Sequence, residues 1–205
     1  MENLNSIKEK VNQMASAVLS MWKLTYDAFI EQDGDLITKA LEEEKILNSL
    51  EDEINSGIPS LAKVTLSDVE KSKIMVYADI AADFELIGDY SKDILERIQI
   101  KIEEKLLFSE DAVSEYKELY SKTKNALEEV VFVLEKDNPA LIKEILRNEE
   151  HIDSLVDKYR QNHNQRLVVG KCSPLGCNMF LNMLDFTAAV YYHIKKIARS
   201  LLKIK

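Results

Sequence analysis

The sequence predicts an all-α protein built as two tandem antiparallel three-helix bundles, six helices in all, with an internal duplication. Three observations support this fold class. The 205 residues contain only 5 Gly and 3 Pro, and Leu, Ile, Glu, Lys and Ala dominate, which favours long helices over strands and tight turns. Helix caps and breaks divide the chain into six segments. The segments of the two halves also correspond in sequence.

In the first half, a helix is expected from about Asn5 to Gln32. The segment Asp33-Gly34-Asp35 stops it, because glycine offers the left-handed geometry of a helix stop. A second helix follows, up to about Gly57. The motif Ser67-Asp68-Val69-Glu70 reads as a capping box, in which Ser67 and Glu70 satisfy early backbone donors. It opens the third helix, which continues to about Glu104.

In the second half, Ser109 caps the fourth helix. Asn138 and Pro139 end it and begin the fifth, with Asn138 as the cap and Pro139 in the first turn. Ser173-Pro174 begins the sixth helix by the same logic.

The two halves align at a nearly constant offset. Glu44, Leu50 and Ile54 correspond to Glu149, Leu155 and Tyr159, an offset of 149 − 44 = 105. The third and sixth helices align at an offset of about 103 residues, which pairs Glu85 with Ala188 and Asp89 with Tyr192. Repeats of this length indicate tandem domains rather than a solenoid, whose units span about 20–50 residues. We expect domains at 1–105 and 106–205, packed end to end.

Charge and hydropathy exclude several classes of protein. The net charge is −9, and no Lys/Arg cluster offers a surface for nucleic acid. No stretch reaches the roughly 18 apolar residues of a membrane span, and the polar start lacks the apolar region of a signal peptide. We expect a soluble, cytoplasmic chain that can lie peripherally at the inner face of the cell membrane. Cys172 and Cys177 are the only cysteines and are expected to be free thiols, too few to close a zinc site alone.

Two acids interrupt the apolar third helix. Glu85 and Asp89 are four residues apart and project from the same face, where they repel each other unless a cation or a donor lies between them. Their neighbours are mostly apolar, so a charge here is costly unless it is paired or bound to a metal. We expect the pair to coordinate a cation or to join a hydrogen-bond network.

The second helix of each half carries polar side chains at the same spacing: Glu44 with Asn48, and Glu149 with Asp153, which Asp157 extends. If the second and third helices run antiparallel, Glu44 and Asn48 face Glu85 and Asp89 and form an oxygen-rich site for a hard or borderline cation. The alternative is that Glu44, Glu149 and Asp157 lie on solvated faces.

The motif Asp83-Phe84-Glu85-Leu86-Ile87-Gly88-Asp89-Tyr90 resembles the signature of PhoU domains, and the paired bundles also resemble that family. The resemblance implies two three-helix bundles whose acid-xxx-acid motifs hold metal ions, iron or zinc among them, in a regulator of phosphate uptake. The metal ligands that it implies are Glu44, Asn48, Glu85, Asp89, Glu149 and Asp153. Ala188 and Tyr192 replace the acids of the second site, so that site should bind metal weakly or not at all.

A second stretch, His163-Asn164-Gln165-Arg166-Leu167 followed by Gly170-Lys171-Cys172, is similar to PhoU domains fused behind sodium/phosphate cotransporters. His163 and Arg166 either complement the carbonyls of a helix end or contact a partner. His193 coincides with a frequent histidine of the family but is expected to be a packed, satisfied side chain. His151 has no assigned role.

The resulting hypothesis is a PhoU-like regulator, not an enzyme, that docks onto a membrane phosphate transporter, a sensor kinase or a second copy of itself. The glycines form no GxGxxG or P-loop motif, which disfavours an NTPase. Two rival hypotheses are a metal-dependent hydrolase or oxidoreductase on a helical bundle, and a metal-free helical scaffold whose acids are neutralised by Lys or Arg.

Overall fold

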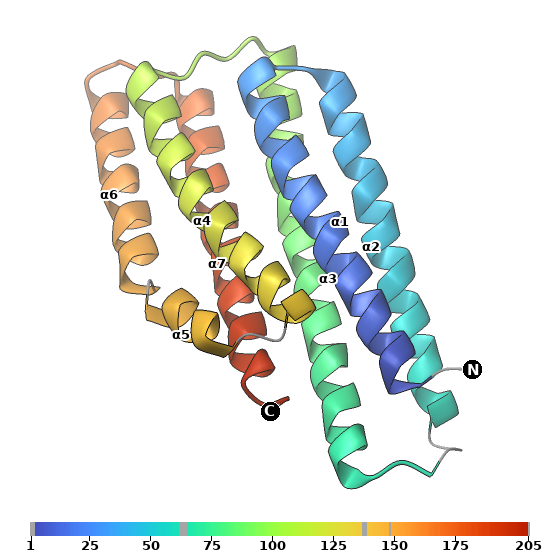
Figure 1. Cartoon of the computed structure of the whole chain (residues 1–205). Helices are drawn as coiled ribbons and strands as arrows, with labels where there is room; N and C mark the ends of the chain where they lie inside the picture. Colours follow the sequence, from blue (N-terminus) through green and yellow to red (C-terminus); the bar gives the residue numbers. More distant parts are fainter. Residues whose placement is uncertain (1–2, 62–64, 137–138, 148, 205) are drawn as a thin grey trace.

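A computed structural model shows an all-α chain, which confirms the predicted fold class (Figure 1). It describes residues 3–61, 65–136, 139–147 and 149–204. Within these ranges the chain forms seven helices: α1 (Leu4–Glu31), α2 (Gly34–Leu61), α3 (Asp68–Glu103), α4 (Glu110–Lys136), α5 (Pro139–Arg147), α6 (Glu149–Val168) and α7 (Pro174–Leu201).

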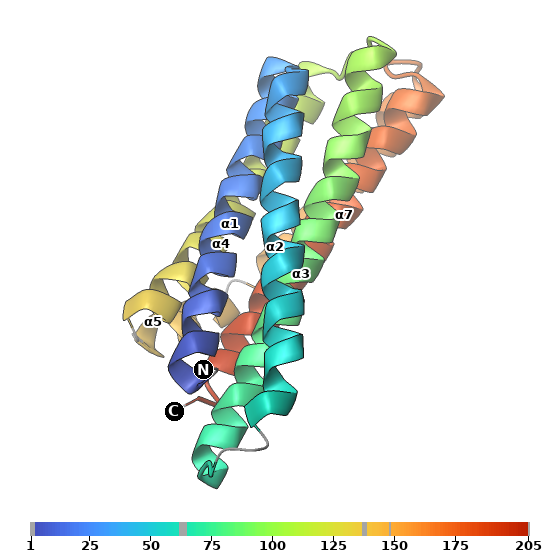
Figure 2. The same cartoon turned by 90° about the vertical axis from the view of Figure 1, so that its right-hand side faces the viewer.

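The helices form two bundles that lie side by side. Helices α1, α2 and α3 pack against one another, and α4, α6 and α7 form the second bundle, with the short α5 against α4 and α7 (Figures 1 and 2). The most extensive contact between any two helices joins α3 to α7, and α1 also packs on α4. The expectation of end-to-end packing was therefore wrong, because α3 and α7 each bury residues on more than the face that serves their own bundle.

Three predicted caps are confirmed. The backbone nitrogen of Glu70 donates to Ser67 Oγ at 3.2 Å, and Glu70 Oε2 accepts from the Ser67 nitrogen at 2.8 Å, which completes the capping box of α3. Ser109 Oγ accepts from the nitrogen of Ala112, and Ser173 Oγ accepts from the nitrogen of Gly176. The predicted cap Asn138 lies outside the described residues.

The predicted end of the first helix near Gln32 is confirmed, although the left-handed residue there is not the expected glycine, and the predicted end of the second helix is displaced. Gln32, not Gly34, takes the left-handed conformation that ends α1, with φ 55°, and Gly34 is the first residue of α2. Helix α2 also continues past Gly57 and includes Pro59. Its last residue, Leu61, is buried, and Ser60 Oγ donates to the Gly57 carbonyl oxygen at 2.7 Å, so packing carries the helix beyond the expected glycine stop.

The predicted fifth helix is divided into α5 and α6. Ile142 and Ile145 of α5 are buried, as are Ile152 and Val156 of α6. Both helices pack against α4 and α7. The division lets two apolar faces reach the same core, which gives seven helices rather than six in the described ranges.

One hydrophobic core runs through both bundles. It includes Trp22 and Ile54 of the first bundle and Tyr116, Phe180 and Tyr191 of the second. Trp22 stacks on Tyr120 with ring centroids 5.5 Å apart, which adds a specific contact between α1 and α4. The division into domains at residues 105 and 106 stays a prediction. No helix in the described part of the chain is long and apolar enough to span a membrane.

Candidate functional site

The predicted acids of the first bundle lie along the line where α2 packs against α3, which we call the acid groove. Glu44 of α2 is buried, and its Oε1 accepts from Lys92 Nζ of α3 at 3.0 Å and from Asn48 Nδ2 at 3.1 Å. A buried carboxylate requires such partners, because its desolvation is otherwise costly. Glu44 therefore belongs to an inward-facing network and not to a solvated face of α2.

Gly88 brings α2 and α3 close together beside these acids. A Cβ atom on Gly88 would lie only 2.8 Å from Leu47 Cδ1 of α2, closer than two carbon atoms can pack. Leu47 is itself fully buried. Glycine at this position thus sets the spacing at which Glu44 on one helix faces Glu85 and Asp89 on the other.

Glu85 is the most strongly perturbed acid of the groove. The pKa of Glu85 is raised to about 7, chiefly by burial. The charges of Asp89, Glu51 and Glu44 and a hydrogen bond with the Asp89 carboxyl raise it further. Around neutral pH, a proton therefore holds Glu85 and Asp89 together for part of the time. Glu51 was not predicted, although it lies seven residues after Glu44 and so on the same face of α2.

The side chains of the acid groove offer oxygen atoms, the ligands that hard cations prefer, but among the described residues no three of its acids bring their ligand atoms within 4.8 Å of one another. The charges of Asp89, Glu51 and Glu44 all act on Glu85, and this repulsion favours an added positive charge nearby. Asn48 donates its amide hydrogen to Glu44, which leaves its carbonyl oxygen as a further ligand. The ammonium group of Lys92 forms an ion pair with Glu44 and neutralises that carboxylate without a metal ion.

The second bundle offers fewer oxygen ligands. Asp153 and Asp157 are exposed on α6, and the side chain of Glu149 lies outside the description, as does that of His151. On α7, Ala188 is half-buried and Tyr192 is exposed, and neither has a carboxyl group. Metal ligation by Glu149 and Asp153 stays a prediction.

A polar contact that the sequence did not reveal joins the two bundles. Asp83 of α3 is buried, and its Oδ1 lies 2.8 Å from His193 Nδ1 and 2.6 Å from Lys196 Nζ, both on α7. The His193 ring stacks on Tyr90, with centroids 5.7 Å apart. His193 is thus packed and hydrogen-bonded, as predicted, but its partner Asp83 is 110 residues away in sequence.

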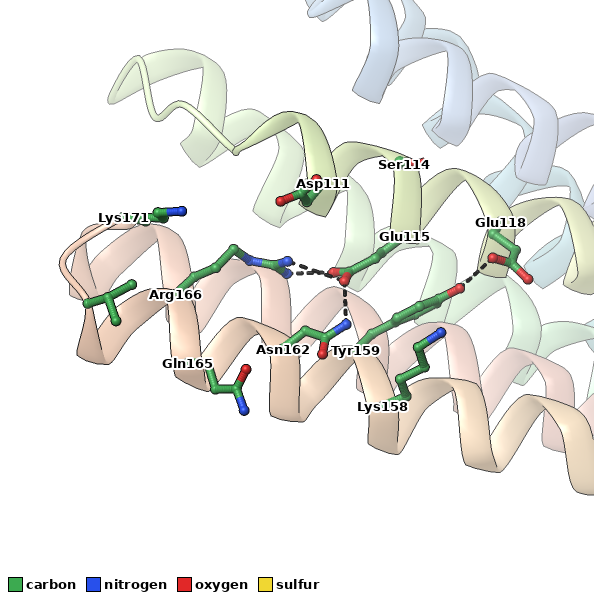
Figure 3. Close-up of a pocket in the computed structure, with 11 residues that line it drawn as sticks. Asp111, Ser114, Glu115, Glu118, Lys158, Tyr159, Asn162, Gln165, Arg166 and Lys171 are labelled. Atoms are coloured by element: carbon green, nitrogen blue, oxygen red, sulfur yellow. Dashed lines mark hydrogen bonds and ion pairs between the residues drawn. The ribbon is translucent and has the colours of Figure 1, made fainter.

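A cavity of about 590 Å³ lies between α4, α6 and the turn after α6, and its lining is shown in Figure 3. Arg166 points across it to Glu115 of α4, with Nη1 at 3.2 Å from Oε1 and Nη2 at 2.5 Å from Oε2. Asn162 Nδ2 also donates to Glu115 Oε1, and Tyr159 donates its hydroxyl to Glu118. Arg166 therefore has an internal acid partner, which neither of the two alternatives for this residue anticipated.

Comparisons with known proteins agree with this arrangement. Residues 11–98 match the family model described as PhoU domain. These residues include the acids of the α2–α3 groove and the motif from Asp83 to Tyr90. No curated protein matches the chain.

Solved structures match nearly the whole chain. PhoU from Pseudomonas aeruginosa has a TM-score of 0.91 at 16% identity, covering 98% of this chain and 96% of that one. The phosphate transport system regulatory protein PhoU from Streptococcus pneumoniae has a TM-score of 0.85 at 12% identity, with 98% and 94% covered. A PhoU-like protein from Shewanella oneidensis has a TM-score of 0.70 at 16% identity, with 98% and 96% covered. At these identities the structural matches show the fold.

Proposed function

We propose that this chain, whose residues 11–98 match the PhoU domain model, is a PhoU-family protein that regulates phosphate transport by binding a membrane phosphate transporter or the proteins that act with it. The observation that carries the proposal is the match itself, which spans the acid groove and the Asp83–Tyr90 motif. The likeness of fold to the phosphate transport system regulatory protein of Streptococcus pneumoniae supports the same role.

The protein acts by docking and not by turnover. Three acids, an amide and a lysine lie in the α2–α3 groove, and Lys92 already binds the most buried of the acids. An ion pair of this kind favours a stable arrangement of two helices over an open position for a substrate. Docking onto a transporter requires the chain to work in the cytoplasm, at the inner face of the cell membrane.

A metal ion in the groove is part of the proposal. Glu44, Asn48, Glu85 and Asp89 would hold it, and iron or zinc are the candidates that the family likeness suggests. A bound cation would fix the orientation of α2 against α3 and thereby the surface that the partner meets. The competing arrangement is a metal-free scaffold in which Lys92 alone neutralises Glu44.

Elemental analysis of protein purified without chelators or metal-affinity resin distinguishes these two arrangements. We expect the unmodified chain to carry one metal ion per chain more than the double variant Glu85→Gln/Asp89→Asn. Asp52→Asn, at an exposed acid of α2, is the matched control and should keep the metal. Metal-free protein of unchanged stability in all three would favour the scaffold and leave the regulatory role to be tested by binding.

Co-purification tests that binding. Ile46 of α2 and Met75 of α3 are large apolar side chains exposed on the matched domain, with 48% and 57% of their surface accessible. Ile46→Glu and Met75→Glu should reduce recovery of the phosphate transporter with the tagged chain from detergent-solubilised membranes. Leu202→Glu, at a site just after α7 that is 43% exposed, serves as the control. Failure of the unmodified chain to retain any phosphate transport component would contradict the proposal.

A further inference from the structure

The turn between α6 and α7 brings together one histidine and two cysteine side chains, which are nitrogen and sulfur ligands rather than carboxylates. One ring nitrogen of His163 and the sulfur atoms of Cys172 and Cys177 all lie within 4.8 Å of one another. In the ranges that the structure describes, no other three His, Cys, Asp or Glu side chains meet in this way. The group lies on the second bundle and shares no residue with the acid groove of α2 and α3.

The backbone of the turn holds the two cysteines in place. Gly170 adopts φ 72°, a left-handed conformation that favours glycine, and the nitrogen of Lys171 donates to the Arg166 carbonyl oxygen at 2.8 Å. The chain therefore folds back at the end of α6. Cys172 then precedes the capping residue Ser173, and the nitrogen of Cys177 donates to the Ser173 carbonyl oxygen at 2.8 Å in the first turn of α7.

His163 is a buried histidine, and one of its two ring nitrogens has no hydrogen-bond partner among the described residues. It is 1% exposed and stacks on Phe180 at 4.3 Å between ring centroids, and that nitrogen is Nε2. An unpaired buried polar atom costs about 1–3 kcal/mol, so it calls for an explanation. Burial and the charge of Arg166 lower the pKa of His163 to about 4, which keeps the ring in the neutral form that binds metals.

The thiols share this enclosed setting. Cys177 is buried and Cys172 is half-buried, so one side of the group opens toward solvent. Burial, then the neighbouring Cys172 thiol, raises the pKa of Cys177 to about 11. Without a cation the Cys177 sulfur therefore holds its proton, and metal binding has to displace it.

We propose that His163, Cys172 and Cys177 form a binding site for a zinc ion. Two thiolates and one imidazole are a ligand set that Zn²⁺ accepts, with water in the fourth position. Zn–S bonds of about 2.3 Å in a tetrahedron place two sulfurs about 3.8 Å apart, so the two sulfur atoms need to approach each other by no more than about 1 Å. Two thiolates also balance the charge of the cation, which suits a largely buried position.

Arg166 contacts the His163 ring, so metal binding would change the hydrogen bond between these two side chains. Its Nη2 lies 3.1 Å from His163 Nδ1, and a guanidinium group only donates, so Nδ1 accepts and Nε2 carries the ring proton. The cation either replaces Arg166 at Nδ1 or binds Nε2 after the proton moves to Nδ1. Arg166 keeps both bonds to Glu115 in either case and loses only the contact with His163.

Titration of the reduced full-length chain with Co²⁺ tests the site, because thiolate ligands give Co²⁺ an intense charge-transfer absorption that carboxylates do not. We expect one equivalent of this absorption per chain and its removal by added Zn²⁺. The double variant Glu85→Gln/Asp89→Asn, which lacks the acid pair of the first bundle, is the control and should give the same spectrum. This control separates the thiolate site from any metal held in the acid groove.

Cys172→Ser tests whether the thiolates bind the metal, because the half-buried position tolerates serine. A substitution of His163 would be less informative, since it also removes the packing of the ring on Phe180. We expect Cys172→Ser to keep its helical circular dichroism, lose the absorption and bind Zn²⁺ more than about 100-fold more weakly, since outer-shell partners alone are worth about 10–100-fold. Absence of the absorption in the unmodified chain with both thiols titratable, or undiminished Zn²⁺ binding in Cys172→Ser, would overturn the proposal.

Discussion

Asp83 Oδ1 of α3 lies 2.8 Å from His193 Nδ1 of α7 and ties the two bundles together at their most extensive contact. Lys196 Nζ reaches the same oxygen at 2.6 Å. The carboxylate is buried, whereas the lysine is half-exposed. Asp83 thus lies within the family motif yet serves the interface between the bundles and not the acid groove.

Asp83→Ala should therefore lower the free energy of unfolding by about 2–3 kcal/mol, because two polar partners on α7 lose a charged acceptor. Urea denaturation followed by circular dichroism measures the change. Asp79→Ala, at an exposed acid one turn earlier on α3, is the matched control and should stay within about 0.5 kcal/mol. Equal effects of the two substitutions would mean that the contact contributes nothing specific.

Glu85 makes stability depend on pH near neutrality. Its pKa is raised from 4.5 to about 7 in the folded chain, so the folded state binds more protons than the unfolded state between these values. The free energy of unfolding should therefore fall as pH rises from 4.5 to about 7. Below this window Glu85 is protonated in both states and has no effect, and above it the folded state carries the full cost of the ionised side chain. Glu85→Gln should flatten the profile and raise stability at pH 8 by about 1 kcal/mol, a figure that allows for screening of this half-buried group.

Urea denaturation of the metal-free chain at several pH values between 4.5 and 8 gives that profile. Asp52→Asn removes an exposed acid from α2 and should leave the profile unchanged. A Glu85→Gln profile that is as steep as that of the unmodified chain would contradict the assignment of the proton to this residue.

Two ion pairs of α6 should differ in their contribution to stability. Arg166 and Glu115 have side chains that are 10% and 12% exposed, whereas Arg160 and Asp185 are 40% and 49% exposed at a similar separation. Arg166→Ala leaves the partly buried Glu115 without its cation and should cost about 3 kcal/mol, the lower end of the range for buried pairs. Arg160→Ala should cost less than about 1 kcal/mol. Thermal denaturation of both variants checks the contrast, and similar losses would refute it.

The close approach at Gly88 predicts a specific coupling with Leu47. Gly88→Ala gains about 1 kcal/mol of helix propensity but overfills the contact with Leu47, which costs about 1–3 kcal/mol. Leu47→Ala alone should cost about 2–5 kcal/mol because it leaves a cavity. In the double variant the new methyl group partly fills that cavity, so the total loss should be smaller than the sum of the single losses. Additive losses in a double-mutant cycle would show that the two side chains do not compete for space.

Local signals predicted most of the fold. The capping box at Ser67 and the Ser173-Pro174 start act through residues three positions apart, which a sequence shows directly. The end of α2 was missed because burial of Leu61 outweighs the stop signal at Gly57. The division between α5 and α6 was missed for a similar reason, since it follows from which apolar side chains reach the common core.

The candidate sites show the same limit. Helical spacing placed Glu85 and Asp89 on one face of α3, and the charges of both Asp89 and Glu44 act on Glu85. Helical spacing alone does not show which basic side chain from a distant part of the sequence contacts each acid. Lys92 reaches Glu44 across 48 positions, and His193 reaches Asp83 across 110. Cys172 and Cys177 looked insufficient for a zinc site because only the folded turn brings His163 to them.

Uptake of radiolabelled phosphate tests the regulatory role most directly. Cells from which the chain has been deleted should continue to take up phosphate at a high rate when phosphate is abundant, and restoring the unmodified chain should reduce that rate. Ile46→Glu and Met75→Glu should restore regulation less completely than Leu202→Glu. Uptake that is the same with and without the chain, at both low and high phosphate, would contradict the account.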